Sequence, residues 1–402
     1  MRKVFSGSIP RVFSSLASVI VLWLLIFSSP SALAQGTATV SPDLVSLYRT
    51  TEGKLDAASL DKIVAQCSDV LAEAQRTKAD RRYAQQLLAW AANQRGQMAS
   101  DEAGRLVEEG ELEAAAALDR KAVADFHLAL QHDPQMLKAR HNLAVGLALH
   151  RKYEEAILQF SEVLKASPKH LPALANRAEL HFQVQSWDAA ERDYTDAIEI
   201  APKDAALWNG RAHARLMLQR YELSLEDYRK ATELEPSRAG YLVDYADACQ
   251  SLGKWKAASE AYVRAIQLDP KEIRAKLNAA WLLATCPEPA IRRPQMALQV
   301  AESMTQDAIQ QDYRYWDTLA AVHASAGDSA KAVEYLARGL ELAPEELQGE
   351  LRQRGALYGK GRAYLQPMDP MALSAMVGEE PTVRRANATE SPAVGSGLKA
   401  SR

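Results

Sequence analysis

The sequence lacks the residue patterns that mark most catalytic and metal-binding sites. It contains no Gly-x-Ser-x-Gly, His-Glu-x-x-His or Cys-x-x-Cys motif, and its eight histidines are scattered. Gly355–Lys360 resembles a phosphate-binding loop only in part, because its glycines are four residues apart and Gly361 follows the lysine. Catalysis needs titratable groups that converge in one pocket. We therefore predict no catalytic residue, no cofactor and no metal site.

Cysteine and β-forming residues are also scarce, and the chain carries no net positive charge. The three cysteines, Cys67, Cys249 and Cys286, are too few for a disulfide framework, although a Cys249–Cys286 disulfide is conceivable. The formal charge is −3, so no nucleic-acid partner is expected. Aromatic residues make up only 7% of the chain, while Ala, Leu and Glu dominate residues 56–360. This composition favours helix over sheet.

Only one apolar run is long enough to suggest membrane contact, and it lies near the N-terminus. Basic residues precede the run Val12–Phe27, and Ala32, Leu33 and Ala34 form a small-x-small cleavage site. The run is shorter than the ~18 residues of a spanning helix. We therefore predict a signal peptide at residues 1–34, a periplasmic or extracellular location, and no membrane span in the mature chain. An uncleaved N-terminal membrane anchor is the alternative.

Prolines divide the middle of the chain at a constant interval. Successive members of one set are 34 residues apart: Pro134, Pro168, Pro202, Pro236 and Pro270. If each proline is given position 32 of a repeat, small residues recur at positions 8, 20 and 27 and aromatic residues at position 24. Position 8 is Ala144, Ala178, Ala212 and Ala246, and position 24 is Phe126, Phe160, Tyr194, Tyr228 and Tyr262. Small residues allow two helices to cross closely, a ring fills the wedge between neighbouring pairs, and proline ends a helix.

This repeat resembles the tetratricopeptide repeat (TPR) family, whose unit is a helix–turn–helix of 34 residues. The segment Trp281–Pro287, followed by Ala297 and Ala301, resembles a bacterial subset of these proteins, and the predicted signal peptide makes this an exported member. The resemblance implies an all-α, right-handed superhelical solenoid of helix–turn–helix repeats. It also implies that positions 2, 5, 6, 9, 12 and 13 of each first helix line a concave groove, in which a peptide binds.

The sequence on either side of the repeats indicates the domain organisation. We predict a linker at 35–55, an N-terminal helical pair at 56–99, and an array of about seven units at 100–345. In the first unit Gly110 occupies position 8. A Pro-rich loop at 284–295 lengthens the sixth unit, a capping helix covers 346–365, and a disordered tail covers 366–402.

Polar residues at the groove positions are the candidate partner-binding residues. Amides can donate to and accept from a peptide backbone, so asparagine is well suited to such a groove. The candidates are Asn142, Asn176, Asn209, Asn278, His141, Glu179, His213 and Asp247. Trp281 is either a packing residue or an exposed aromatic anchor. Arg177 and Arg211 at position 7 are expected to be structural, with stems packed and guanidinium groups in water. Arg292 and Arg293 are candidates for contacts outside the groove.

These features favour a non-catalytic scaffold that binds a protein or peptide through the groove, outside the cytoplasm. Two other functions stay open. The chain could be a targeting or recruitment subunit of a cell-envelope enzyme complex, although few residues lie outside the repeats. It could instead be a self-associating structural envelope protein, although the polar segment after Pro344 disfavours stacking. The sequence specifies neither the partner nor the oligomeric state.

Overall fold

The computed structural model describes residues 40–49, 56–304 and 310–367. The predicted signal peptide, most of the predicted linker and residues 368–402 of the predicted tail lie outside this part. The described residues form two compact units. The N-unit contains residues up to Ala248 together with Glu260–Ala275. The C-unit contains Cys249–Ser259 and the residues from Lys276 onward.

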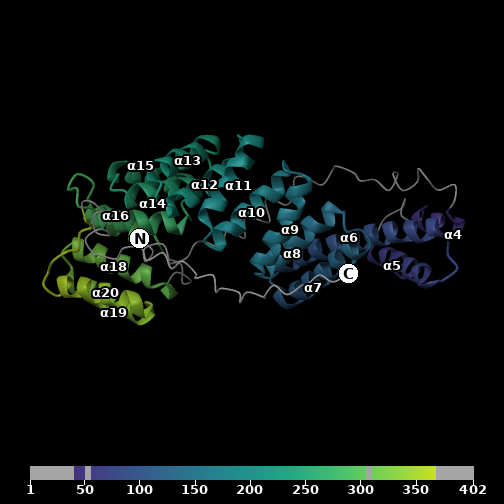
Figure 1. Ribbon diagram of the computed structural model, residues 1–402. Coiled ribbons are helices and arrows are strands. Elements are labelled where there is room, and N and C mark those ends of the chain that lie inside the picture. Colours follow the sequence, from purple (N-terminus) through teal and green to yellow (C-terminus); the bar gives the residue numbers. More distant parts are fainter. Residues whose placement is uncertain (1–39, 50–55, 305–309, 368–402) are drawn as a thin grey trace, which may run out of the picture. The chain divides into compact units, whose positions relative to one another are not determined.

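All regular secondary structure in the described residues is α-helical (Figure 1). The helices are α4 (Pro42–Arg49), α5 (Ala57–Ala72), α6 (Lys78–Glu108), α7 (Leu112–His132), α8 (Leu137–Leu149), α9 (Tyr153–Ala166), α10 (Leu171–Gln183), α11 (Trp187–Ile200), α12 (Ala205–Met217), α13 (Tyr221–Leu234), α14 (Ala239–Ser251), α15 (Trp255–Leu268), α16 (Ile273–Thr285), α17 (Pro294–Glu302), α18 (Tyr313–Ser325), α19 (Ser329–Leu342) and α20 (Glu345–Tyr358). The predicted all-α solenoid of helix–turn–helix repeats is confirmed.

The repeat positions chosen from the sequence form the core of the array. Every alanine at position 8 is fully buried, as are Val163 and the alanines around it at position 27. Position 8 meets position 20 where the two helices of a unit cross, because the Ser224 hydroxyl donates to the carbonyl of Ala212 at 2.8 Å. Each position-24 ring is at least 95% buried. Small residues at the crossings and rings in the wedges therefore set the spacing of the stack.

The turn between the two helices of a unit has one conformation in five units of the array. Its second residue, at position 15, has a positive φ in five units: Arg151 (59°), Gln185 (62°), Gln219 (61°), Gly253 (69°) and Gly327 (90°). In the first of these turns the N–H of Lys152 donates to the carbonyl of Leu147. This is the Schellman closure, which satisfies carbonyls at the end of the first helix. Non-glycine residues accept the left-handed region here because the helices on both sides fix the turn.

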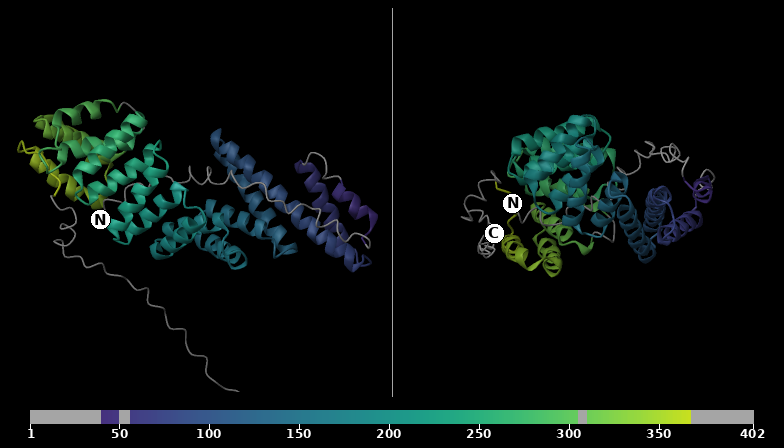
Figure 2. Two further views of the ribbon diagram at one scale, coloured as in Figure 1. Left: turned by 90° about the horizontal axis from the view of Figure 1, so that it is seen from above. Right: turned by 45° about the vertical axis from the view of Figure 1, so that its right-hand side comes forward.

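The N-terminal region departs from the predicted boundaries. Helix α6 is continuous through the predicted boundary at 99/100 and lies beside both α5 and α7 (Figure 2). Gly96 lies inside this helix without ending it. The Phe126 ring of α7 packs against Gly96 at the place where a Cβ would stand. Gly110 ends α6 with a φ of 84°. In the first unit this glycine is therefore the turn residue and not the small residue of a helix crossing.

The predicted linker contains an ordered helix. Leu44 of α4 is fully buried against the apolar faces of α5 and α6. The Asp80 carboxylate accepts hydrogen bonds from both the backbone N–H and the hydroxyl of Ser41, at 2.8 and 3.0 Å. These bonds, together with those from Thr77, hold the pKa of Asp80 below its usual value. Residues 41–47 are therefore part of the folded N-unit.

The C-unit is built around α18, α19 and α20. Trp316, Leu319, Leu336 and Leu351 belong to one apolar cluster. On α20, the side chains of Leu347, Leu351 and Tyr358 are buried, while those of Glu345, Glu346 and Glu350 are exposed. This pattern fits a capping helix. Cys67, Cys249 and Cys286 are buried and form no disulfide, so the conceivable Cys249–Cys286 bridge is absent. Within the described ranges, no helix combines the length and the apolar character needed to cross a membrane.

Candidate functional site

The candidate residues lie on the first helices of successive repeats, and we call the surface formed by positions 5, 6 and 9 of these helices in the N-unit the A-helix face. On it, Asn176 is buried, while His141, Asn142, Glu179 and Asn209 are half-buried. The candidate Asn278, in the C-unit, is also half-buried. The face is therefore lined by polar groups that are partly shielded from water. Their chemistry depends on the contacts that each side chain makes.

Three consecutive units repeat one hydrogen bond from position 24 to position 9. The Tyr194 hydroxyl donates to Glu179 at 3.0 Å, and the Tyr262 hydroxyl donates to Asp247 at 2.5 Å. Between them, the Tyr228 hydroxyl lies 2.6 Å from Nδ1 of His213. Burial raises the pKa of Tyr194 and of Tyr228, so both hydroxyls remain protonated. A buried tyrosine thus orients each candidate at position 9.

Polar side chains also join the first helices of neighbouring units. The Asn209 amide on α12 donates to Asp244 on α14 at 3.0 Å, and Arg274 at the start of α16 forms an ion pair with the same carboxylate. His213 lies 3.5 Å from Asp244. Burial would raise the pKa of Asp244, but His213 and Arg274 outweigh it and lower the pKa. We call Asn209, His213, Asp244 and Arg274 the polar strip.

At the other end of the A-helix face, the polar groups are neutral. The His141 ring packs against the rings of Phe160 and His170, with centroid distances of 5.4 and 5.2 Å. Burial, with a contribution from His170, lowers the pKa of His141 to about 4, so it carries no charge at pH 7. Next to it, the Asn142 amide donates to the buried Asn93 side chain at 3.2 Å. This end can offer hydrogen bonds but no charge.

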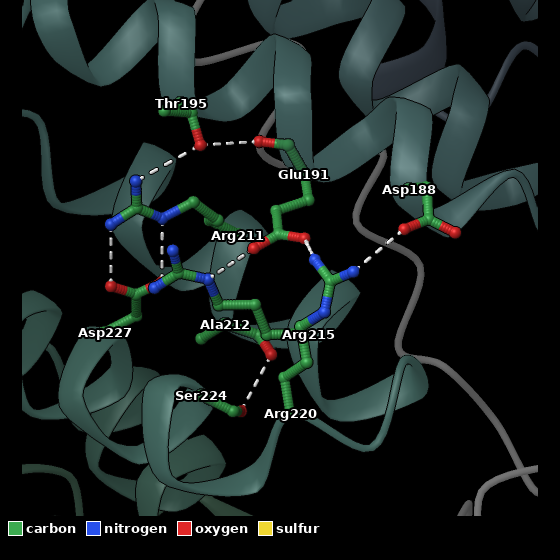
Figure 3. Close-up of polar contacts among 9 residues, drawn as sticks. All are labelled: Asp188, Glu191, Thr195, Arg211, Ala212, Arg215, Arg220, Ser224 and Asp227. Carbon is green, nitrogen blue, oxygen red and sulfur yellow. Dashed lines mark hydrogen bonds and ion pairs between the residues drawn. The ribbon is translucent and has the colours of Figure 1, made fainter.

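Arginines at position 7 stabilise the stack. Arg177 makes two hydrogen bonds to Asp193, at 2.8 and 2.7 Å, and a third to Ser161 of the preceding unit. Arg211 repeats the arrangement with Asp227 and Thr195 (Figure 3). The structural role predicted for these arginines agrees with the contacts. The expectation that the guanidinium group is solvated was wrong for Arg211, which is buried and paired with the aspartate at position 23, whereas the Arg177 side chain keeps 21% exposure.

Figure 3 shows that the ion pairs continue from this buried pair to the surface. Arg215 donates to Asp227 at 2.7 Å and to Glu191 at 2.8 Å. Glu191 also pairs with Arg220, which reaches the exposed Asp188 at 3.1 Å. The network joins α11 to α12 and α13, so its role is to hold two units together. It lies apart from the predicted groove residues.

The loop and the tryptophan of the sixth unit are engaged within the chain. Arg292 donates to the carbonyl of Cys286 at 2.9 Å, and Arg293 donates to that of Ala290 at 3.2 Å. These guanidinium groups fold onto their own loop. Trp281 is half-buried, and the ring of Tyr364 packs against it. Trp281 is therefore in contact with the segment that follows α20.

Tyrosine hydroxyls and position-6 aspartate are the functional features that the sequence reasoning missed. Position 24 is Phe160 where position 9 is the apolar Val145, and it becomes tyrosine where position 9 is Glu179, His213 or Asp247. This parallel change was visible in the sequence and could have revealed the hydrogen bonds. Asp244 replaces asparagine at position 6, and its partner Arg274 stands at position 2 of the next unit. In the described part of the chain, no group of three or more His, Cys, Asp or Glu residues is arranged to hold a metal ion.

Several solved structures are similar to this chain. A tetratricopeptide repeat protein from Parabacteroides merdae is 15% identical, with 64% of this chain and 97% of that chain covered and a TM-score of 0.47. MamA (residue 41 to the end) from Desulfovibrio magneticus is 18% identical, covering 44% and 96%, with a TM-score of 0.39. Yeast Tom70 is 16% identical, covering 80% and 63%, with a TM-score of 0.41. No curated protein sequence matches significantly.

One sequence family matches the array. The model described as "Tetratricopeptide repeat" matches residues 205–238, 239–272 and 313–346. These matches coincide with the helix pairs α12/α13, α14/α15 and α18/α19. Each has the 34-residue length that the proline spacing predicts.

Proposed function

Because this chain belongs to the tetratricopeptide repeat family, whose repeats serve as scaffolds for protein interactions, we propose that it is a non-catalytic scaffold that binds a protein or peptide partner through its A-helix face outside the cytoplasm. The fold supplies the surface for such binding. The candidates on that surface give it a specific chemistry, which differs from one end to the other.

The polar strip is the observation that carries the proposal. Asn209, Asp244 and Arg274 come from three successive first helices, and hydrogen bonds and ion pairs fix their positions before any partner arrives. Pre-organised groups lose less side-chain entropy when a ligand binds.

The arrangement favours many moderate contacts over one deep pocket. The neutral end around His141 and Asn142 can make backbone-directed hydrogen bonds, whereas the polar strip can distinguish charged groups. A partner that spans several units would gain binding free energy from its contacts with each unit. An extended segment or an exposed helix of a protein fits such a surface.

Site-directed photocrosslinking tests the partner-binding surface. A photoreactive amino acid at Asn142 or Asn209 should capture one or a few specific proteins in intact cells. The matched control places it at Leu158, whose side chain is 64% exposed on α9, away from the A-helix face. Equal capture from all three positions, or no specific product from Asn142 and Asn209, would count against the proposed surface.

The N-terminal sequence supports export and suggests its own test. The basic, apolar and small-residue segments of residues 1–34 follow the order of a cleaved signal. We expect the protein in the envelope fraction with Gln35 as its first residue, as determined by N-terminal sequencing. An intact N-terminus in the membrane fraction would indicate the anchor, and protein confined to the cytosol would contradict export.

A further inference from the structure

The chain returns over the C-unit after its last helix. Helix α20 ends at Tyr358, and the N–H of Arg362 donates to the carbonyl of Leu357 at 2.9 Å. Gly361 supports this turn with a φ of 67°. Residues 362–367 are not helical. Leu365 is exposed while Tyr364 and Gln366 are half-buried, so these two side chains lie on the protein.

Gln366 is bound at both its backbone and its side chain. Its N–H donates to the carbonyl of Thr285 at 2.8 Å, and its Nε2 donates to the Thr285 hydroxyl at 2.7 Å. Its Oε1 accepts from Nε2 of Gln250 at 3.2 Å. The carboxamide thus finds a donor on α14 and an acceptor on α16. Glutamate could not donate to Thr285, so the site distinguishes an amide from a carboxylate.

Tyr364 occupies an aromatic site beside this amide site. Its ring centroid lies 5.9 Å from that of Trp281, and the Arg354 guanidinium lies 5.4 Å from each ring. Arg354 is held in place by Asp317 at 2.9 Å. Burial raises the pKa of Tyr364, so its hydroxyl is neutral at pH 7. An aromatic side chain is favoured here by the neighbouring ring and by the adjacent cation.

Both sites lie on the face of α16 that carries the candidate residue Asn278. Asn278, Trp281 and Thr285 are spaced by three and four residues on α16, so they lie on one face of that helix. The segment Tyr364–Gln366 therefore rests on this face of α16, within the C-unit. It fills this place in the manner of a bound peptide.

We propose that Gln250, Trp281 and Thr285 form a docking site for an extended peptide with an aromatic residue and, two residues later, a carboxamide, and that the chain's own residues 362–367 occupy it until such a partner displaces them. This inference rests on the proposed scaffold function and adds to it the chemistry of one ligand. The internal segment is tethered close to its site, so its effective concentration is on the order of millimolar. A partner with the same pattern must exceed that competition, which restricts binding to segments that match well.

A binding assay on the full chain tests the proposal. The probe is a fluorescein-labelled hexapeptide with the sequence of Arg362–Pro367, and fluorescence anisotropy measures its binding. The double variant Tyr364→Ala/Gln366→Ala removes the recognition groups of the internal segment and leaves the docking site intact. We expect it to bind the probe at least about ten-fold more tightly than the wild type, because internal competition is lost.

Two controls separate docking from a change in fold. A probe with alanine at the tyrosine and glutamine places should bind neither protein, and Thr285→Val in the double variant should weaken the binding of the intact probe. Thr285→Val keeps the side-chain volume, and circular dichroism verifies that the helices persist. Equal affinity of the intact and the alanine probe for the double variant would overturn the proposal, as would equal affinity of the intact probe for wild type and double variant.

Three further outcomes would each decide which part of the proposal is wrong. A wild-type protein that sediments as a dimer and becomes monomeric in excess probe would overturn the internal occupant in favour of the segment of a second copy. Photocrosslinks at Asn142 and Asn209 without any probe binding would refute this docking site and leave the proposed function standing. Probe binding without those crosslinks would refute the proposed N-unit surface alone.

Discussion

Asp227→Asn tests whether the buried ion pairs hold the repeats together. The Asp227 side chain is 2% exposed, and it accepts hydrogen bonds from Nε and Nη2 of Arg211, at 2.8 and 2.9 Å, and from Nη1 of Arg215, at 2.7 Å. Asparagine has almost the same shape but no charge, and it replaces one acceptor oxygen with a donor NH₂ group. The substitution therefore leaves Arg211, whose side chain is 10% exposed, without a counter-charge.

The expected loss follows from burial. Breaking a buried ion pair by removing one partner destabilises a protein by about 3–5 kcal/mol, because the other charge remains buried. Arg215 keeps its bond to Glu191, which places the expected loss toward the lower end of that range. At the far end of the same network, Asp188 is 61% exposed and its partner Arg220 is 44% exposed. Asp188→Asn should therefore change stability by less than about 1 kcal/mol.

Urea unfolding, followed by circular dichroism at 222 nm, measures both variants. Because repeat arrays can unfold in steps, hydrogen exchange of the backbone of α13 should be measured in parallel. We expect Asp227→Asn to lower the unfolding midpoint and speed exchange in α13, and Asp188→Asn to leave both near wild type. Equal effects of the two substitutions would refute the reasoning, since they differ chiefly in burial.

Three further predictions concern other parts of the chain. Gly210→Ala should lower the free energy of unfolding by about 1–3 kcal/mol, because the added Cβ would overlap the Tyr194 ring. Gly104→Ala in α6 should raise it by about 0.5–1 kcal/mol, because the added Cβ meets nothing within 4 Å; urea unfolding measures both changes. Burial raises the pKa of Asp317 to about 6 from 3.8 despite Arg354, so its contribution favours folding below pH 4 and is lost as pH rises through 6. Acidification from pH 7 to 4 should thus stabilise wild type relative to Asp317→Asn by up to about 3 kcal/mol, measured from urea midpoints at each pH. The Cys67 thiol, whose pKa burial raises to about 12, should react with a thiol reagent at pH 8 only after the protein is unfolded; rapid labelling of the native chain would contradict its burial.

The periodic part of the fold could be predicted because each repeat position has one dominant physical demand. Ala144 and Ala178 must be small where helices cross, and Phe160 must fill a wedge, whatever the rest of the unit contains. The prolines fix the phase of the pattern, so a single mistake at one position cannot shift the whole reading. The bounds of α8 to α16 follow from these constraints.

The structure departs from the sequence-based predictions near the two ends of the repeat array. Gly110 matches position 8 in sequence, but α6 is held by α5 and α7 as one long helix, and the glycine is needed to end it. The segment around Tyr364 has no periodicity, so sequence patterns treat it as part of a cap. Its contacts to Trp281 and Thr285 join residues more than 80 positions apart, and only the folded chain brings them together.

The array carries two polar systems whose burial gives them different roles. The Arg–Asp pairs at positions 7 and 23 are almost removed from water, so losing one partner leaves an uncompensated charge, and they fix how units stack. In the polar strip the Asp244 side chain is only 13% exposed, but His213 is 39% and Arg274 31% exposed, so these two groups can exchange water for a ligand at little cost. A partner on the A-helix face would therefore contact a surface already held in shape by bonds that it does not touch. Binding then requires no deformation of the stack, and the affinity of each unit can change by substitution at positions 5, 6 and 9 alone.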